Sequence, residues 1–439
     1  MVRHTAIILG LVLSIVGSVL GDAKPGGIAR QISLGGSQAG SQLILNPFVM
    51  EDPALMLLNP AYQSMYRDYG WMNIGGGTLN GLSSSDNGYG NQNAGVNFAL
   101  SDEWGLGAVL SHDPSGVNAI ILGLNTLGAR IPPVQNMWEI VASHQSGSLT
   151  LGFGFMYGRS NSDSTSSTVT PPTSGSAERK ANVLGFRAGL IYDMGSGDAL
   201  DMSATLHLDN AESKGSFTGG ATTVSSSIKA TAAEVGFAAR WKHKINQKWS
   251  VIPVGALAFA STKPDTNGTS NGMKISALAY SIGIGGEYRT ADFYLAGGLS
   301  YQSAQVKAEI GPDTNKSTTT FRLTSIPTIN VGGEWWFTSW LAGRAGYYRS
   351  MASFKNKFES KNANSETNLT IPNSFIFIGG LSPSNNDGLI TLGLGFKFGN
   401  FSLDATVSEE ALRRGLGLIG ASDNINTFGY ITSSYNFGD

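Results

Sequence analysis

Apolar residues alternate with small or polar residues along most of this chain. Within residues 231–242, Val235 and Phe237 fall on one face of an extended strand, whereas Glu234 and Arg240 fall on the other. Successive side chains of a strand point to opposite faces, so a period of two predicts strands that have one apolar face. The same pattern recurs at intervals to the end of the sequence, and it predicts an all-β protein.

The alternation predicts strands of about 9 to 20 residues, where about 5 to 6 residues is usual in globular proteins. We expect sixteen strands, at 69–80, 91–100, 104–112, 136–145, 148–159, 180–193, 199–210, 227–242, 248–262, 272–289, 291–309, 319–338, 340–355, 387–398, 400–409 and 425–437. Residues 375–380 are either another strand or part of a loop, so 14 or 18 strands remain alternatives.

The connections between these strands alternate in length. Short ones are expected at 101–103, 146–147, 195–198, 246–247, 290, 339 and 399. Long polar ones are expected at 81–90, 113–135, 160–179, 211–226, 263–271, 311–318, 356–386 and 410–424. We interpret 160–176 and 355–365 as mobile exterior loops, because they hold too few apolar residues to build a core.

Two environments suit strands of this kind. A soluble sandwich would bury the apolar faces, whereas a membrane barrel would point them at lipid and enclose the polar faces. Strand length, alternating connections and aromatic residues near strand ends favour the barrel; these aromatic residues include Trp241, Trp249, Trp335, Trp336 and Trp340. The fold class is therefore predicted to be a transmembrane, antiparallel, up-and-down β-barrel. An even strand number puts both chain ends on the side of the short turns, which is the periplasm.

The first residues have the layout of a secretory signal peptide. Arg3 and His4 precede an apolar run at 6–20, and Gly21-Asp22-Ala23 follows it. The run is short for a membrane-spanning helix, which needs about 20 residues, although an uncleaved anchor is the alternative. We therefore predict residues 1–23 as a signal peptide, 24–68 as an N-terminal plug and 69–439 as a barrel in the bacterial outer membrane.

Residues 24–68 do not alternate. Asp52-Pro53 and Asn59-Pro60-Ala61 each place a helix-capping side chain before a proline, which predicts short helical turns at 53–58 and 60–67. The region is also strongly apolar, which is hazardous on an exposed tail. Enclosed in a barrel, it forms a partly helical plug.

These residues carry a resemblance to a known family. Glu51-Asp52-Pro53-Ala54, then Asn59-Pro60-Ala61 and a first strand at 70–77, resemble the start of FadL-type transporters of hydrophobic compounds, and PorV-type secretion proteins share a similar start. Tyr435-Asn436-Phe437 resembles the family's ending. The resemblance implies a barrel of 14 strands, an N-terminal plug, and passive uptake of long-chain fatty acids or aromatic hydrocarbons. This chain departs from it by one extra hairpin and by ending in Gly438-Asp439.

Composition narrows the functional classes. Only 14% of residues are charged, Lys and Arg number 29 against 31 Asp and Glu, and 58 of 439 residues are glycine. The low content of charged residues argues against a disordered chain. The nearly equal numbers of basic and acidic residues argue against a nucleic-acid partner, which needs a concentrated basic surface. There is no cysteine, and the five histidines show no metal-binding spacing. We therefore expect no catalytic residue, no metal, no cofactor and no enzyme activity.

Charged residues on the polar faces are predicted to point into the lumen, because a charge facing lipid costs about 2–4 kcal/mol at the membrane midplane. They are either a gate that anchors the plug and a substrate carboxylate, or a mixed-sign ladder that holds wall and plug together. The set comprises Glu139, Arg187, Glu234, Arg240, Lys242, Glu287, Arg289, Glu334, Arg344, Lys397 and Asp404.

Three functions are compatible with such a barrel. The first is a transporter of hydrophobic small molecules, whose partners are membrane lipid and substrate. The second is a general porin, which requires an open, water-filled lumen. The third is a PorV-like scaffold without transport, whose exposed loops would hold a protein partner.

Overall fold

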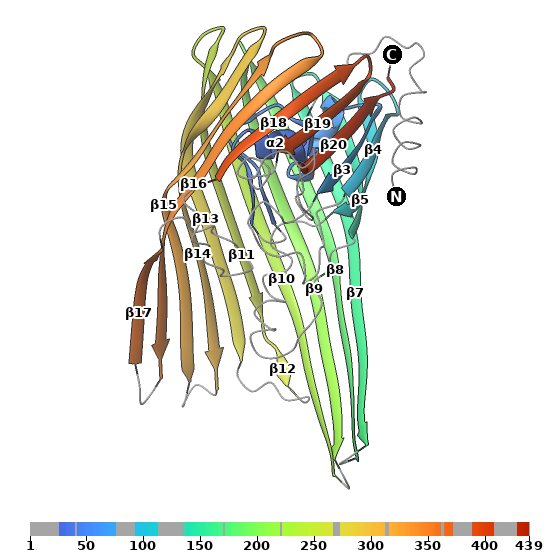
Figure 1. The fold of residues 1–439 in the computed structure, drawn as a ribbon, viewed down its shortest axis with the longest axis vertical. Helices are drawn as coiled ribbons and strands as arrows, with labels where there is room; N and C mark the ends of the chain where they lie inside the picture. Colours follow the sequence, from blue (N-terminus) through green and yellow to red (C-terminus); the bar gives the residue numbers. More distant parts are fainter. Residues whose placement is uncertain are drawn as a thin grey trace, which may run out of the picture.

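The chain forms a tall β-barrel in a computed structural model (Figure 1). The residues that the structure describes are 26–39, 42–75, 93–112, 134, 137–169, 172–219, 222–266, 273–311, 316–360, 364–371, 389–407 and 428–438. The candidate strand at 375–380 lies outside these residues. Among them, no helix combines the length and the apolar composition of a membrane-spanning helix.

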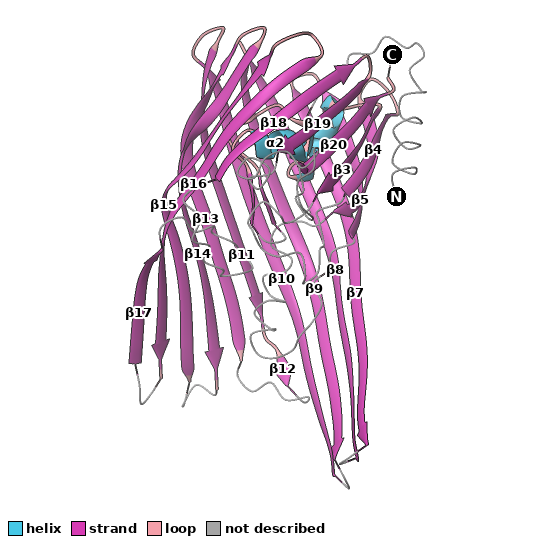
Figure 2. Cartoon of the chain, viewed as in Figure 1, coloured by secondary structure: helices cyan, strands magenta, loops and turns pink. Residues whose placement is uncertain are grey.

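Sixteen strands make up the barrel wall in the described part of the chain, which confirms the predicted number and the all-β fold. Each pairs antiparallel with its neighbours in sequence, and β20 pairs with β3 to close the cylinder (Figure 2). The wall strands are β3 (Tyr69–Gly75), β4 (Asn93–Ala99), β5 (Trp104–His112), β6 (Met137–Ser146), β7 (Leu149–Val169), β8 (Pro172–Gly195), β9 (Asp198–Gly219), β10 (Thr222–Lys244), β11 (Trp249–Thr262), β13 (Lys274–Arg289), β14 (Phe293–Ile310), β15 (Ser317–Trp336), β16 (Leu341–Glu359), β18 (Leu389–Phe398), β19 (Phe401–Val407) and β20 (Phe428–Asn436).

The predicted alternation sorts residues between the two sides of the wall. Phe237 is 50% exposed on the outside, whereas Glu234 on the same strand is 7% exposed and faces the interior. Large apolar side chains cover the outer surface, including Phe153, Ile282 and Leu299. The unpaired outer face of a soluble sheet would not carry such a surface, whereas a lipid-facing wall requires it.

The two ends of the barrel differ. Short turns join β6 to β7, β8 to β9, β10 to β11, β13 to β14, β15 to β16 and β18 to β19 at one end, which we call the short-turn end. β3 begins and β20 finishes at this end, where Asn436 pairs with Tyr69. The opposite end, at the bottom of Figure 1, is the long-loop end.

Strands β7 to β10 run on through two segments that were predicted as loops. The prediction of loops at 160–179 and 211–226 was wrong, because β7 pairs with β8 as far as Val169↔Pro172 and β9 pairs with β10 as far as Gly219↔Thr222. The four strands extend beyond the other wall strands at the long-loop end (Figure 1).

Charge pairing explains this extension. Glu178 stands opposite Lys214, and Lys180 stands opposite Glu212, so opposite charges face each other across β8 and β9. Such cross-strand pairs stabilise a sheet, and continuing an existing ladder satisfies the backbone without a new apolar core. We predicted loops because these segments have too few apolar residues to build a core. A sheet that continues an existing one does not need such a core.

Two short strands complete the sheet. β12 (Asp265–Thr266) pairs with β10, and β17 (Asn364–Ile371) pairs with the long-loop half of β16, whose other half pairs with β18. The predicted mobile loop at 355–365 is therefore also wrong over 355–359 and 364–365, which are strand. In the extension of β7 to β10 and at 355–365, a run of polar side chains therefore did not mark the end of a strand.

Candidate functional site

Residues 26–39 and 42–68, which we call the lumen segment, lie inside the barrel near its short-turn end (Figure 2). They form α2 (Ile28–Ser33), β1 (Ser37–Ala39), β2 (Gln42–Ile44) and two 3-10 helices, η1 (Pro53–Leu57) and η2 (Pro60–Met65). Helix α2 packs against β16, β18, β19 and β20, and η2 packs against β5 to β8. The segment therefore contacts opposite sides of the wall.

The capping motif at 52–61 starts both 3-10 helices, as the sequence predicted. The Asp52 carboxylate accepts the Ala54 N–H at 2.8 Å and the Gly27 N–H at 3.0 Å. The Asn59 side-chain oxygen Oδ1 accepts the Ala61 N–H at 2.9 Å, and Pro53 and Pro60 occupy the first helical positions. Asn59 also donates to the Asp201 carboxylate at 2.5 Å, so one cap also joins the segment to the wall.

Glycines let the lumen segment lie directly on the wall. A Cβ placed on Gly332 would collide with the Leu34 backbone, and one on Gly152 would collide with the backbone at Pro60 and Ala61. At these positions an inward-facing glycine lets the backbone of the lumen segment approach the wall strand closely, and it is not there to make the strand flexible.

The first charged anchor surrounds Arg30, which is buried. Its guanidinium donates to the Asp52 carboxylate at 2.8 Å and to both Glu334 oxygens at 2.9 and 3.1 Å. Arg344 reaches the same Glu334 at 2.5 Å and Asp404 at 2.6 Å. The Gly26 N–H donates to Asp404 at 2.9 Å, so the chain of charges begins and ends on the lumen segment.

The second anchor holds Glu51. Its carboxylate lies 2.5 Å from the Arg289 guanidinium and 3.4 Å from the Lys242 ammonium. Glu287 pairs with Lys242 and lies 3.9 Å from Arg289. Burial would raise the pKa of the Glu51 carboxyl, but Arg289 and Lys242 together hold that pKa below its usual value of 4.5. Glu51 is therefore ionised in this setting.

Two further anchors use backbone carbonyls of the segment. Arg240 pairs with Asp201 and donates to the Val49 carbonyl at 3.0 Å. Arg187 pairs with Glu139 at 2.5 Å and donates to the Leu57 carbonyl at 2.5 Å. Without the lumen segment, the buried guanidinium groups of Arg240 and Arg187 would lose these carbonyl acceptors.

The structure thus brings together most of the predicted lumen-facing charges. Two residues of the set stand apart: Lys397 lines a cavity at the short-turn end, and Glu234 lies nearer the long-loop end, 3.9 Å from His207. Sequence reasoning missed Arg30, Glu51 and Asp201. The signal was weak, because Arg30 and Asp201 are single charges between uncharged residues; Glu51 directly precedes the capping motif.

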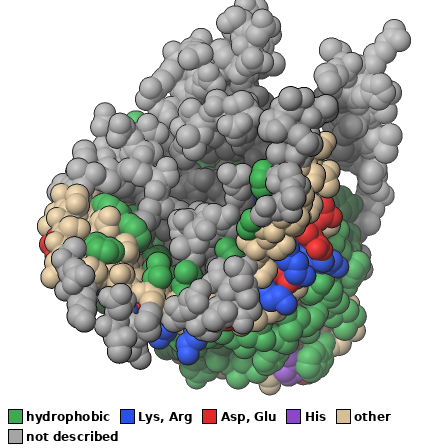
Figure 3. Space-filling view, turned by 90° about the horizontal axis from the view of Figure 1, so that it is seen from below, with side chains coloured by type: hydrophobic (Ala, Val, Ile, Leu, Met, Phe, Trp, Pro, Cys, Tyr) green, Lys and Arg blue, Asp and Glu red, His purple; other side chains and the backbone are tan. Residues whose placement is uncertain are grey.

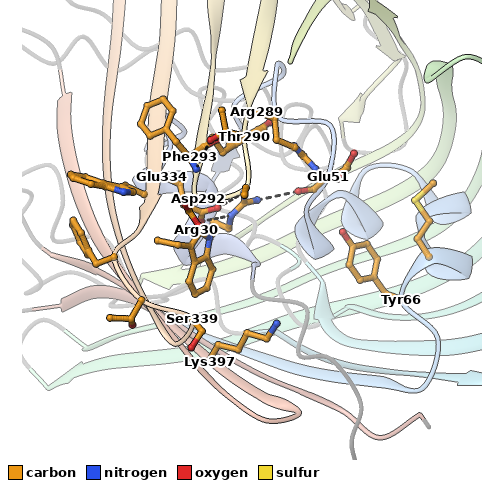
Figure 4. A pocket seen from close by; sticks show the side chains of 17 residues that line it. Arg30, Glu51, Tyr66, Arg289, Thr290, Asp292, Phe293, Glu334, Ser339 and Lys397 are labelled. Atoms are coloured by element: carbon orange, nitrogen blue, oxygen red, sulfur yellow. Dashed lines mark hydrogen bonds and ion pairs between the residues drawn. The ribbon is translucent and has the colours of Figure 1, made fainter. Parts of the chain in front are cut away.

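A cavity of about 1050 Å³ opens at the short-turn end between the lumen segment and the turns at 290–292 and 337–339 (Figure 4). Arg30, Glu51 and Glu334 line it on one side, and Trp335 and Phe337 line it on the other. The dashed contacts of Arg30 and Arg289 in Figure 4 are the anchors just described. Both charged and aromatic side chains therefore line this cavity, which we call the mouth cavity.

On the long-loop side of the lumen segment, the inner wall carries two apolar clusters. Small and large apolar side chains from neighbouring strands form a buried cluster; it comprises Val134, Met137, Met156, Ala181, Val183, Ala211, Ala230, Ala232 and Ala260. A second buried cluster joins Ala279, Ala304, Leu323 and Ala352. The lumen of a water-filled pore is polar. The two apolar clusters therefore distinguish the lumen of this barrel from the lumen of such a pore.

Polar groups lie between the first cluster and the Arg187 anchor. His207, Asp209 and Glu234 are each at most 7% exposed, and both Asp209 carboxylate oxygens have no hydrogen-bond partner among the described residues. Over the part of the chain that is described, no group of three or more His, Asp or Glu side chains has a geometry that could hold a metal ion.

Comparison with known proteins gives distant structural likenesses only. No family model and no curated protein sequence matches the chain. A FadL homologue from Pseudomonas aeruginosa has a TM-score of 0.40 at 12% identity, and the toluene transporter TodX from Pseudomonas putida has 0.39 at 11%; each alignment covers 95% of this chain and 100% of the other. The ferric citrate transporter FecA has 0.34 at 10%, covering 84% and 78%. At these scores the likeness assigns neither a family nor a substrate.

Proposed function

We propose that this chain is an outer-membrane transporter for the passive uptake of hydrophobic small molecules, such as long-chain fatty acids or aromatic hydrocarbons. The two apolar clusters of the inner wall on the long-loop side carry the proposal. A buried surface of Met, Val, Ala and Leu side chains binds apolar molecules by removing their surface from water, at about 25 cal/mol per Å².

The lumen segment would act as the plug. Its backbone and side chains occupy the short-turn end, so a molecule from the apolar region meets η1 and η2 before it reaches the mouth cavity. Passage requires either a shift of the segment or an exit through the wall. Four charged anchors oppose a shift, and they are therefore the groups that would set how readily the plug yields.

Two other functions are open to the same test. A general porin would need an open, polar lumen, whereas here the lumen segment is packed against the wall and two inner clusters are apolar. A PorV-like scaffold would use its exterior for a protein partner, and the extension of β7 to β10 offers such a surface. The inner apolar clusters favour the transporter, because a scaffold has no use for them.

Uptake by the full chain and by a chain lacking residues 42–68 tests the proposal. Proteoliposomes that contain each protein would be given a radiolabelled long-chain fatty acid, toluene or a small sugar. We expect the full chain to pass the fatty acid or toluene and to exclude the sugar, and the deletion to admit all of them. Circular dichroism in detergent shows whether each barrel is folded.

Other outcomes identify the alternatives. A large steady current from the full chain in planar bilayers, with passage of the sugar, would make it a porin. Transport of none of the three solutes by a folded full chain, with capture of a periplasmic or surface protein, would make it a scaffold. Equal uptake by the full chain and by the folded deletion would contradict the plug role.

A further inference from the structure

A groove on the outer surface of the barrel crosses β10, β11, β13, β14 and β15. It has a volume of about 790 Å³, and we call it the outer groove; its lining includes Ala239, Gly255, Ile282, Leu299 and Ile326. Ile282, Leu299 and Ile326 are 65%, 52% and 64% exposed. Ala239 and Gly255 are register partners on β10 and β11, and their small size makes the floor of the groove.

Basic side chains lie on β14, β15 and the neighbouring β16, closer to the long-loop end. We call Lys307, Arg322, Lys355 and Lys357 the basic patch. Arg322 lies four residues from Ile326 along β15, which is roughly 13 Å at about 3.3 Å per residue. It shares the outward face with Ile326, because Leu323 between them is buried. The groove and the patch therefore form one continuous surface.

One positive charge of the patch, that of Arg322, has no carboxylate partner among the described residues. Arg322 stands directly opposite Lys355 on β16, and like charges in that position destabilise a sheet. Lys355, Lys357 and Lys307 each have a carboxylate within 2.7 Å, at Glu366, Glu359 and Glu309. The Arg322 guanidinium instead bonds the Gln305 amide oxygen at 3.0 Å, and no described carboxylate pairs with it.

Aromatic hydroxyls mark the boundary between groove and patch. Tyr280 and Tyr301 lie side by side, with 3.4 Å between their hydroxyl oxygens, where the apolar surface gives way to the polar one. Tyrosine prefers this level of a membrane, because its ring is apolar and its hydroxyl is wet. Charged side chains gather on the rim next to the apolar wall when the barrel is viewed from the long-loop end (Figure 3).

We infer that the outer groove and the basic patch bind a phosphorylated glycolipid of the outer leaflet, with an acyl chain in the groove and a phosphate on Arg322 and Lys355. A phosphate offers Arg322 the bidentate partner that Gln305 does not supply, and it relieves the repulsion between Arg322 and Lys355. This inference rests on the outer-membrane location in the proposed function and on the predicted orientation, in which the short turns are periplasmic. The long-loop end then faces outward, so the headgroup level on that side belongs to the outer leaflet.

Native mass spectrometry of the full chain in detergent, titrated with lipid A, tests this inference. We expect lipid A to bind more tightly than lipid A without phosphate groups and more tightly than phosphatidylglycerol. The double variant R322Q/K355Q should bind lipid A about thirtyfold more weakly, because each of the two basic residues near an anionic lipid surface contributes about 1 kcal/mol, and every 1.4 kcal/mol is about tenfold in affinity. The variant G255L, which fills the groove floor, should weaken binding of lipid A with and without phosphates.

The matched control is K244Q/K248Q, which removes the same charge from exposed positions at the short-turn end. It should bind lipid A as the unmodified chain does, and circular dichroism confirms that each variant is folded. Equal binding of lipid A with and without phosphates would overturn the inference, as would undiminished binding by folded R322Q/K355Q. Equal or tighter binding of phosphatidylglycerol would overturn the assignment to a glycolipid.

Discussion

Arg30 joins two buried carboxylates, that of Asp52 on the lumen segment and that of Glu334 on the wall. Replacing it with glutamine leaves Asp52 and Glu334 buried beside one cation fewer, and breaking a buried pair in this way costs about 3–5 kcal/mol. We therefore expect R30Q to loosen α2 while the wall stays closed. Hydrogen–deuterium exchange in detergent should show faster exchange in peptides that cover residues 28–33 and unchanged exchange in β13 to β16.

The variant R322Q is the control for Arg30, since it removes an exposed guanidinium from the outer wall. Its exchange in residues 28–33 should match that of the unmodified chain. If R30Q also leaves this exchange unchanged, the Arg30 anchor does not hold the segment.

Glu51 gives the segment a dependence on pH. Its pKa in the folded chain lies below the usual 4.5, so its contribution is fully present above pH 4.5 and is lost as the pH falls through the lower folded value. E51Q removes that contribution at every pH. The exchange of residues 48–56 should therefore be faster in E51Q than in the unmodified chain above pH 4.5, and the difference should shrink at lower pH.

Using the difference between the two chains removes the effect of other carboxylates that titrate in acid, such as Asp52 and Asp404. A difference that grows on acidification would show that Glu51 is not held in its ionised form.

The sequence indicates some of these residues better than others. Asp52 and Asn59 are visible because a cap followed by proline is a local pattern, and both caps are present. Arg30 and Asp201 act through partners far away in the chain, so only the folded barrel brings them together. A period of two shows that Glu334 faces inward, but it does not show which group meets it there.

Strands are well predicted where lipid faces them, and poorly where it does not. All sixteen wall strands overlap the predicted ranges, because the outward apolar side chains give a strong alternation. The alternation fades in the extension of β7 to β10, where both faces carry Ser, Thr and charged side chains. Helix α2 was not predicted, since it has only six residues and no side chain caps its start.

The extension makes a prediction about backbone protection. β6 pairs with β7 only as far as Trp138↔Tyr157, so among the described residues β7 has a single neighbour, β8, from Arg159 to Val169. In a ladder with one neighbour, alternate amides are hydrogen-bonded. Exchange measured by NMR should therefore be slow at every second amide between residues 159 and 169. Residues 151–156, which have neighbours on both sides, should exchange slowly at successive amides.

Uniformly fast exchange across 159–169 would restore the interpretation of this segment as a loop. As an internal reference, the paired β8 residues 173–182 have neighbours on both sides and should be protected throughout.

Barrel and lumen segment fit together through inward glycines, and the sequence does not reveal this fit. Glycine on an inward face resembles any small residue of a curved sheet, yet Gly332, Gly346 and Gly393 each touch the backbone or side chains of residues 33–35. The apolar inner clusters are hidden in the same way, because alanine at inward positions reads as small rather than apolar. The alternation in the sequence therefore predicts the outer surface better than the inner surface, on which the proposed function depends.

Because of this fit, we expect the position of the lumen segment to depend on the size of the inward-facing side chains of the wall. In G332L, a leucine side chain would meet Leu34, and overpacking of this kind costs about 1–3 kcal/mol, which a plug held by noncovalent contacts relieves by moving away from the wall. We therefore expect G332L to raise ion conductance in planar bilayers above that of the unmodified chain. G255L adds the same side chain on the outer face, where only the Ser281 carbonyl lies within 4 Å, and it should leave conductance unchanged. Equal conductance in a folded G332L barrel would mean that plug position does not depend on this contact, and the anchors alone would then fix the segment in the lumen.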